Sequence, residues 1–317
     1  MQELIIKMLL FISAGILWQK LNFSRFPANL TRKIISTSVL FVLLPCLVLI
    51  VIWKASLSFD SIRISISAMT AVLSCTFLAW ALTRTLHMSR PVAGTLILVA
   101  AFPNATYMGL PVLTSLFGVS AQGIALQFDL FACLPLLLTL GIGIARHYGS
   151  PDSSNTLNQV SLQVPEHDKA FSLFRLPPIW AAALAVILNL THVPVPHIIE
   201  TVLSFIGGLV IPLMLFAIGL SLNWRTLSWP ILKTLMPFVL LQIIVMPLVV
   251  WPTAYLLGLS GDTLAAVVIE GAMPVMLLGI VITDRFNLDR SLYASAVTFT
   301  TLGSLALIPA WYYLLTR

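Results

Sequence analysis

The sequence has very little charge for its length. Only 9% of its 317 residues are Asp, Glu, Lys or Arg, whereas 59% are apolar. A soluble globular chain carries roughly 25% charged residues, so this chain cannot surround a single aqueous core. Long apolar runs recur along nearly its whole length. We therefore expect an all-α protein that crosses a lipid bilayer several times.

Cysteines and catalytic signatures are also scarce. Cys46, Cys75 and Cys133 all fall inside apolar runs, without disulfide or metal-ligand spacing. No Gly-x-Gly-Asp, Gly-x-Ser-x-Gly or His-Glu-x-x-His motif occurs. We expect no enzyme and no cofactor. The net charge of +6 comes from short loops without interleaved aromatics, so we expect no nucleic-acid partner.

Ten apolar segments are candidate membrane-spanning helices, for which roughly 20 residues cross ~30 Å of hydrocarbon. They are Leu4–Trp18, Ile34–Trp53, Ile64–Leu82, Val92–Phe117, Ala121–Ala145, Leu173–Leu190, Ile198–Leu222, Pro230–Leu257, Thr263–Thr283 and Leu292–Leu315. The first segment is the shortest. In the seventh, Gly207, Gly208 and Gly219 are expected to allow close helix packing.

A polar stretch divides these segments into two sets of five. Residues 146–172 are rich in Ser, Asn, Pro and charge without periodicity, which is typical of a linker. They separate residues 1–145 from residues 173–317. Because five is odd, tandem halves of this kind face opposite ways. We therefore expect two inverted five-helix repeats.

The distribution of Lys and Arg predicts the orientation. With the N-terminus outside, only Lys7, Lys54, Arg63 and Arg317 of the 17 basic residues remain on the outer side. Basic residues accumulate in cytoplasmic loops. We therefore expect a bacterial-type inner-membrane protein with both termini extracytoplasmic and a cytoplasmic central linker.

The fourth and ninth segments are interrupted at matching places in the two halves. Phe102–Pro111 reads FPNATYMGLP, and Glu270–Gly279 reads EGAMPVMLLG. Such paired interruptions indicate the binding site of a secondary transporter, because unwound backbone inside a membrane must be satisfied by protein or by a water-filled cavity. Simple proline kinks are the alternative interpretation.

Two acids lie well inside predicted spans, and intramembrane acids are candidate functional groups. At ~1.5 Å per residue, Asp129, Glu270 and Asn104 all lie roughly 10–12 Å below the outer ends of their predicted spans, and so in one layer near the middle of the membrane. Carboxylate and amide oxygens suit a hard cation. We predict that Asp129, Glu270, Asn104 and Thr106 couple transport to an ion, with unwound carbonyls near Met273 completing the shell. The alternative for Asp129 is a protonated, hydrogen-bonded structural acid.

The substrate is expected at the same breaks. Helix N-termini at the breaks favour anions through free N–H groups, and no Lys, Arg or His lies at that depth. We predict a substrate site made by Pro103, Asn104, Thr106, Met273 and Pro274. A small organic anion is expected, and a monocarboxylate is favoured over a dicarboxylate.

At these residues the chain resembles the auxin efflux carrier family, which includes the plant PIN proteins. The matching features are Pro45, the run Asn104-x-Thr106-x-x-Gly109-Leu110-Pro111, residues 212–222 (PLMLFAIGLSL) and residues 272–274 (AMP). The resemblance implies a scaffold domain, a transport domain with crossing broken helices four and nine, elevator-like alternating access, organic-anion substrates and a homodimer.

A more distant resemblance is to the bile acid sodium symporters, in which a Glu and a Met three residues later help to bind sodium at the ninth-helix break. Glu270 and Met273 match this pattern, whereas Pro274 replaces a glutamine. Because Glu270 and Asn104 both lie at the breaks, we expect a sodium-coupled transporter of small organic anions. The alternatives are a proton-coupled or uncoupled carrier, a channel or transport-derived sensor, and an intramembrane enzyme with an Asp129–Glu270 carboxylate pair.

Overall fold

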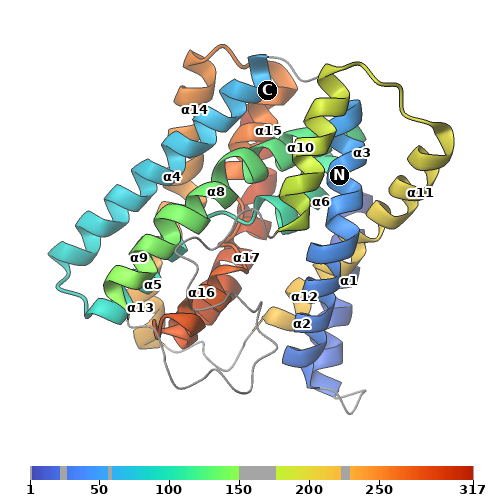
Figure 1. The fold of residues 1–317 in the computed structure, drawn as a ribbon. Helices are drawn as coiled ribbons and strands as arrows, with labels where there is room; N and C mark the ends of the chain where they lie inside the picture. Colours follow the sequence, from blue (N-terminus) through green and yellow to red (C-terminus); the bar gives the residue numbers. More distant parts are fainter. Residues whose placement is uncertain (1, 22–26, 56–58, 150–175, 223–228, 317) are drawn as a thin grey trace.

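A computed structural model describes residues 2–21, 27–55, 59–149, 176–222 and 229–316, and every regular element in these ranges is a helix (Figure 1). Six helices are long and apolar enough to cross a membrane: Leu30–Lys54, Phe59–Thr85, Val119–Tyr148, His197–Ser221, Trp229–Leu256 and Arg290–Leu315. Shorter apolar helices are Leu9–Leu21, Arg90–Ala101, Ala105–Phe117 and Pro177–Leu190. The all-helical membrane fold is confirmed.

Other expectations about organisation stay predictions. The expected linker lies mostly at residues 150–175, outside the described ranges, and the inverted repeat and orientation are untested. The first helix, α1 (Gln2–Leu21), is longer than the Leu4–Trp18 expected from the sequence.

The helices form two groups, seen on opposite sides of Figure 1. The group that we call the scaffold contains α1, α2 (Ala28–Ser38), α3 (Leu44–Lys54), α10 (Pro177–Leu190), α11 (His197–Gly208) and α12 (Val210–Ser221). Within it, α10 and α11 pack on α3, and α1 and α2 pack on α12.

The second group, which we call the core, contains the remaining helices. They are α4 (Phe59–Thr85), α5 (Arg90–Ala101), α6 (Leu110–Phe117), α7 (Gln122–Phe128), α8 (Leu134–Leu136), α9 (Ile142–Tyr148), α13 (Trp229–Leu240), α14 (Met246–Leu256), α15 (Gly261–Gly271), α16 (Gly279–Arg285) and α17 (Arg290–Leu315). The groups meet where α3 packs on α7 and where α12 packs on α17 and on residues 105–109.

Several helices widen into π-helical turns beside proline. The described π turns are η1 (Val39–Leu43), η2 (Ala105–Gly109), η4 (Asp129–Cys133), η5 (Leu137–Gly141) and η8 (Leu241–Val245). All but η5 end two residues before a proline: Pro45, Pro111, Pro135 and Pro247. Proline lacks an N–H, and its ring clashes with the carbonyl four residues earlier. A wider turn accommodates both effects.

Side chains from α10 secure the end of α3. The Asn189 Nδ2 group donates to the carbonyl oxygens of Ile52, Trp53 and Ala55 at 3.1, 2.8 and 2.6 Å. The Trp53 indole in turn donates to the Val193 carbonyl at 2.8 Å. The last carbonyls of a helix have no partner within it, so these bonds tie α10 to α3 as one unit.

Glycines set how closely α1 and α12 approach. A Cβ on Gly219 would lie 2.1 Å from the Ile12 carbonyl oxygen, and one on Gly15 would lie 2.3 Å from that of Phe216. The predicted close packing is thus confirmed for Gly219. It is also confirmed for Gly207, where a Cβ would lie 3.0 Å from the Leu47 Cα. For Gly208 it is wrong, because a Cβ there meets no atom within 4 Å.

We expect Gly219→Ala to destabilise the protein by roughly 1–3 kcal/mol, because the added methyl meets backbone that cannot rotate away. The control is Gly208→Ala, in the neighbouring helix, where open space leaves only the helix preference of alanine. Thermal unfolding of both variants in detergent measures the difference. Equal melting temperatures for the two variants would contradict the close crossing.

Candidate functional site

The first break separates α5 from η2 and α6. Phe102 leaves the helix with extended backbone, at φ −119° and ψ 102°. A residue before proline is disfavoured in the helical region, and Pro103 has no N–H to continue α5. Helix resumes at Ala105. The sequence Phe102-Pro103-Asn104 thus encodes the interruption locally.

The second break separates α15 from α16. Helix α15 ends at Gly271, α16 begins at Gly279, and Pro274 lies between them. The predicted interruptions of both segments are confirmed as places where the backbone leaves the helix. Simple kinks within continuous helices are excluded, because residues 272–278 and 102–104 are unwound.

The two breaks hydrogen-bond to each other. The Asn104 N–H donates to the Pro274 carbonyl at 2.7 Å, and the Met276 N–H donates to the Phe102 carbonyl at 2.9 Å. Pro103 and Val275 form an antiparallel bridge between these bonds. Unwound backbone is expensive in an apolar environment unless it is paired. Each break therefore supplies hydrogen-bond partners to part of the unwound backbone of the other.

Side chains complete the second break. Three side chains donate hydrogen bonds to its carbonyl oxygens: Gln242 to Met273 at 3.0 Å, Tyr293 to Met276 at 2.7 Å and Ser304 to Ala272 at 2.8 Å. A fourth side chain, Thr300, accepts a hydrogen bond from the Val275 N–H at 3.2 Å. They come from η8 and α17, so these two segments hold the unwound chain in place.

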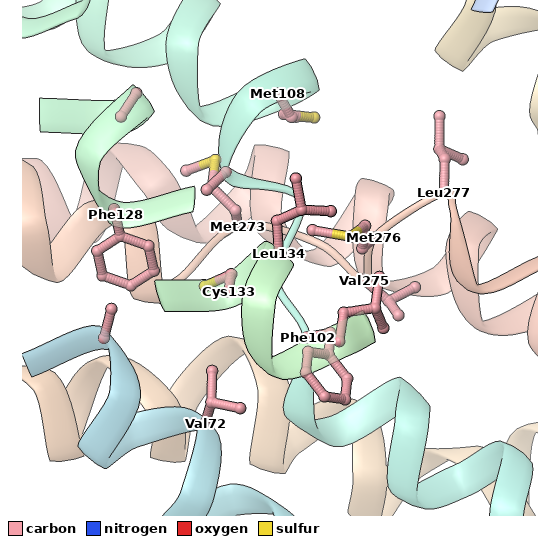
Figure 2. Close-up of a cluster of buried hydrophobic side chains, with 14 of the residues drawn as sticks. Val72, Phe102, Met108, Phe128, Cys133, Leu134, Met273, Val275, Met276 and Leu277 are labelled. Atoms are coloured by element: carbon pink, nitrogen blue, oxygen red, sulfur yellow. The ribbon is translucent and has the colours of Figure 1, made fainter. Parts of the chain in front are cut away.

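Apolar side chains enclose the crossing. Figure 2 shows Phe102 of the first break with Val275 and Met276 of the second, and Cys133 and Leu134 of the neighbouring segment. Phe102 and Cys133 are fully buried, and Val275 is 1% exposed. The hydrogen bonds between the breaks are thus shielded from competing solvent, which strengthens them.

The two predicted acids are both buried beside the breaks. Thr106 Oγ1 donates to Asp129 Oδ2, while Asp129 Oδ1 has no partner. Glu270 is 0% exposed, and neither of its carboxyl oxygens has a partner. A Cβ on Gly109 would lie 2.1 Å from Glu270 Oε2, so the carboxyl group rests directly on the η2 backbone.

A profile of the family described as "Membrane transport protein" matches residues 2–312. The chain belongs to this family of membrane transporters. The transporter is 27% identical over 288 residues to an "Uncharacterized transporter" of Methanothermobacter thermautotrophicus, covering 90% of this chain and 87% of that protein. It is 24% identical to the "Uncharacterized transporter YfdV" of Escherichia coli K12, covering 85% and 84%.

A plant relative matches over a shorter length. The transporter is 28% identical over 147 residues to the "Probable auxin efflux carrier component 5b" of Oryza sativa, covering 44% of this chain and 40% of that protein. The resemblance to the auxin efflux carrier family is confirmed. The protein is a membrane transporter and not an enzyme.

The structure gathers the predicted site residues of the transporter in one buried region. Asn104 and Thr106 are each 3% exposed, Asp129 is 6% exposed, and Met273 is fully buried. Direct contacts join Asn104 to Pro274 through the backbone and Thr106 to Asp129 through side chains. The Met273 carbonyl, a predicted cation ligand, already accepts one hydrogen bond from Gln242.

Two residues that contact the second break or the buried Glu270 carboxyl were not predicted from the sequence as part of the site. Gln242 is fully buried, donates to the second break, and leaves its Oε1 unpaired. The sequence does contain a signal for Gln242, because a polar amide inside an apolar span is a candidate functional group. Gly109 forms the surface on which the Glu270 carboxyl rests, and only the three-dimensional contact reveals that role. Gln127, another buried amide, is 5% exposed.

We expect Gly109→Ala to destabilise the transporter by roughly 1–3 kcal/mol, because the methyl group would overlap the Glu270 carboxyl. In a Glu270→Ala background the same substitution should cost much less, since the opposing group is gone. Thermal unfolding of both single variants and the double variant gives the coupling, expected at about 0.5–3 kcal/mol. Additive effects would mean that the two residues are not in contact.

Proposed function

We propose that this protein is a secondary active transporter of small organic anions that works by alternating access and is coupled to sodium. The observation that carries the proposal is the set of buried unpaired side-chain atoms. Among the described residues these atoms are Asp129 Oδ1, Gln242 Oε1, Glu270 Oε1 and Glu270 Oε2. All four are oxygen acceptors, and three of them belong to carboxyl groups.

A cation explains this set of acceptors. Buried polar groups left without partners are costly, and two nearby carboxylates cannot both stay charged in an apolar interior without a compensating positive charge. The described buried side chains include no Lys, Arg or His. Sodium is a hard cation that takes oxygen ligands, and carboxylate, amide and hydroxyl oxygens are the groups present.

The anionic substrate would lie at the same breaks. With no buried base among the described residues, its charge would rest on backbone N–H groups and on the co-bound cation. Helical segment 105–117 begins at the first break, and helix N-termini favour negative charge. Pro103, Asn104, Thr106, Met273 and Pro274 are the proposed substrate contacts. A single carboxylate suits this weakly positive environment better than two.

The two helix groups support an elevator-like movement. The breaks belong to the core, and η2 packs against α12 of the scaffold. Relative movement of the core along this contact would carry the paired breaks from one side of the membrane to the other. A homodimer, external termini and a cytoplasmic linker complete the proposal, as the family resemblance and the basic loops imply.

Proton coupling is the second candidate. It is favoured by the packing of Glu270, which is fully buried against Gly109. A proton on this carboxyl would remove the buried charge and supply one donor, without requiring the oxygen coordination shell of a metal ion. An uncoupled carrier requires neither ion.

We expect sodium, relative to choline at constant ionic strength, to raise the melting temperature of the purified protein. A ligand that binds only the folded state at a hundred times its Kd contributes about 2.7 kcal/mol. Glu270→Gln should abolish this sodium effect. The control Ser304→Ala removes a hydrogen bond from the same break without removing an unpaired oxygen, and should keep it.

Uptake into proteoliposomes then separates the candidates. A sodium gradient should drive accumulation of a monocarboxylate, with saturation and counterflow, and Glu270→Gln should lose the coupling. Uptake that follows a proton gradient and ignores sodium would replace sodium by the proton. Normal sodium-driven uptake by Glu270→Gln would overturn the proposed role of this residue.

A further inference from the structure

An open groove of about 440 Å³ lies on the core between α4 and the segment that ends in α9. Its lining includes Trp80 from α4 and Leu140, Gly143 and Ile144 from the other side. A Cβ placed on Gly143 would meet no atom within 4 Å, so the missing side chain leaves room in the groove. The part of the groove between Trp80 and residues 140–144 is therefore roomy and mostly apolar.

A second, smaller groove of about 140 Å³ adjoins the first and is basic. The two share His147 and Tyr148, and the second adds Arg84 and Arg90. The Arg84 guanidinium lies 5.8 Å from the centre of the Trp80 ring. Arg90 donates a hydrogen bond to the His147 carbonyl. Among the described residues that line these grooves there is no acid.

The two arginines keep donors for a ligand. A guanidinium has five N–H groups. Arg90 uses one of them to donate to the His147 carbonyl, and Arg84 lies over the Trp80 ring. Both residues are exposed. Two arginines close to one another form a favourable site for a phosphate group, which can accept bidentate hydrogen bonds.

The surface of α4 changes regularly along its length toward this basic end. Leu73, Phe77, Trp80 and Arg84 recur at the spacing of one helix face, and Leu73, Phe77 and Trp80 are 47%, 63% and 42% exposed. From Leu73 to Arg84 the helix rises roughly 16 Å. The order is aliphatic, aromatic and then cationic, which matches the layers of one bilayer leaflet.

We propose that the two grooves together bind one anionic phospholipid. Its phosphate lies between Arg84 and Arg90, and one acyl chain follows Phe77 and Trp80 into the space above Gly143. Basic pockets between transmembrane helices are suited to anionic headgroups, and the continuous apolar groove selects a lipid over free phosphate. The inference needs only the membrane location of the protein and not the proposed coupling ion.

Native mass spectrometry of the full-length protein in detergent tests this site with an equal mixture of phosphatidylglycerol and phosphatidylcholine. We expect the wild-type protein to retain roughly tenfold more phosphatidylglycerol than phosphatidylcholine, because two cationic side chains meet the anionic headgroup. Arg84→Gln combined with Arg90→Gln should remove the preference. Arg285→Gln is the matched control, since Arg285 also lies 5.8 Å from an aromatic ring, that of Phe286, but lines neither groove.

Gly143→Leu keeps the test decisive if loss of Arg90 impairs folding. The added side chain enters open space and should leave the fold intact while it displaces the acyl chain, so retention of phosphatidylglycerol should fall about tenfold. Equal retention of both lipids by the wild type, or unchanged retention in Gly143→Leu, would overturn the proposal. A dimer that disappears in Gly143→Leu would instead identify a second copy of the chain as the occupant.

Discussion

A peptide group inside a membrane must be hydrogen-bonded, and the centre of this structure depends on how that requirement is met at two interrupted helices. Neither break pairs all of its backbone N–H and C=O groups within its own segment. Asn104 and Phe102 therefore bond to Pro274 and Met276 across the crossing. Segments η8 and α17 supply the remaining partners. Because each break supplies hydrogen-bond partners to the other, segments more than 150 residues apart in sequence are held as one unit, which is what the proposed movement of the core requires.

The same enclosure determines the electrostatics of the site. One Asp129 oxygen accepts a hydrogen bond from the Thr106 hydroxyl, whereas the Glu270 carboxyl rests on Gly109 without a hydrogen-bond partner. The buried side chains that the structure describes include no Lys, Arg or His, so the proposed function assigns charge compensation to a bound cation or to a proton. The proposed coupling would then have a physical origin, because an ion that stabilises the enclosed site would also prepare it for an anionic solute.

Much of the fold could be predicted because it is encoded locally. Apolar runs specify spans, and Pro103 and Pro274 specify where helices stop. The acids stand out because charge is rare inside spans. Prolines also mark the π turns, because four of the five described π turns end two residues before a proline. The pairing of the breaks, the contact of Gly109 with Glu270 and the role of Gln242 depend on long-range packing that no local pattern contains. Gly208 shows the opposite error, since a glycine in a span need not mark a helix contact.

The most direct test of the crossing is a disulfide between its two breaks. Residues opposite one another in an antiparallel bridge have Cα atoms about 4.5–5.5 Å apart, which lies within the range for disulfide formation. In a variant lacking Cys46, Cys75 and Cys133, Pro103→Cys with Val275→Cys should cross-link on mild oxidation. Pro103→Cys with Thr283→Cys, in the middle of α16, should not. Cross-linking of the second pair, or failure of the first in folded protein, would contradict the crossing on which the proposed transport site depends.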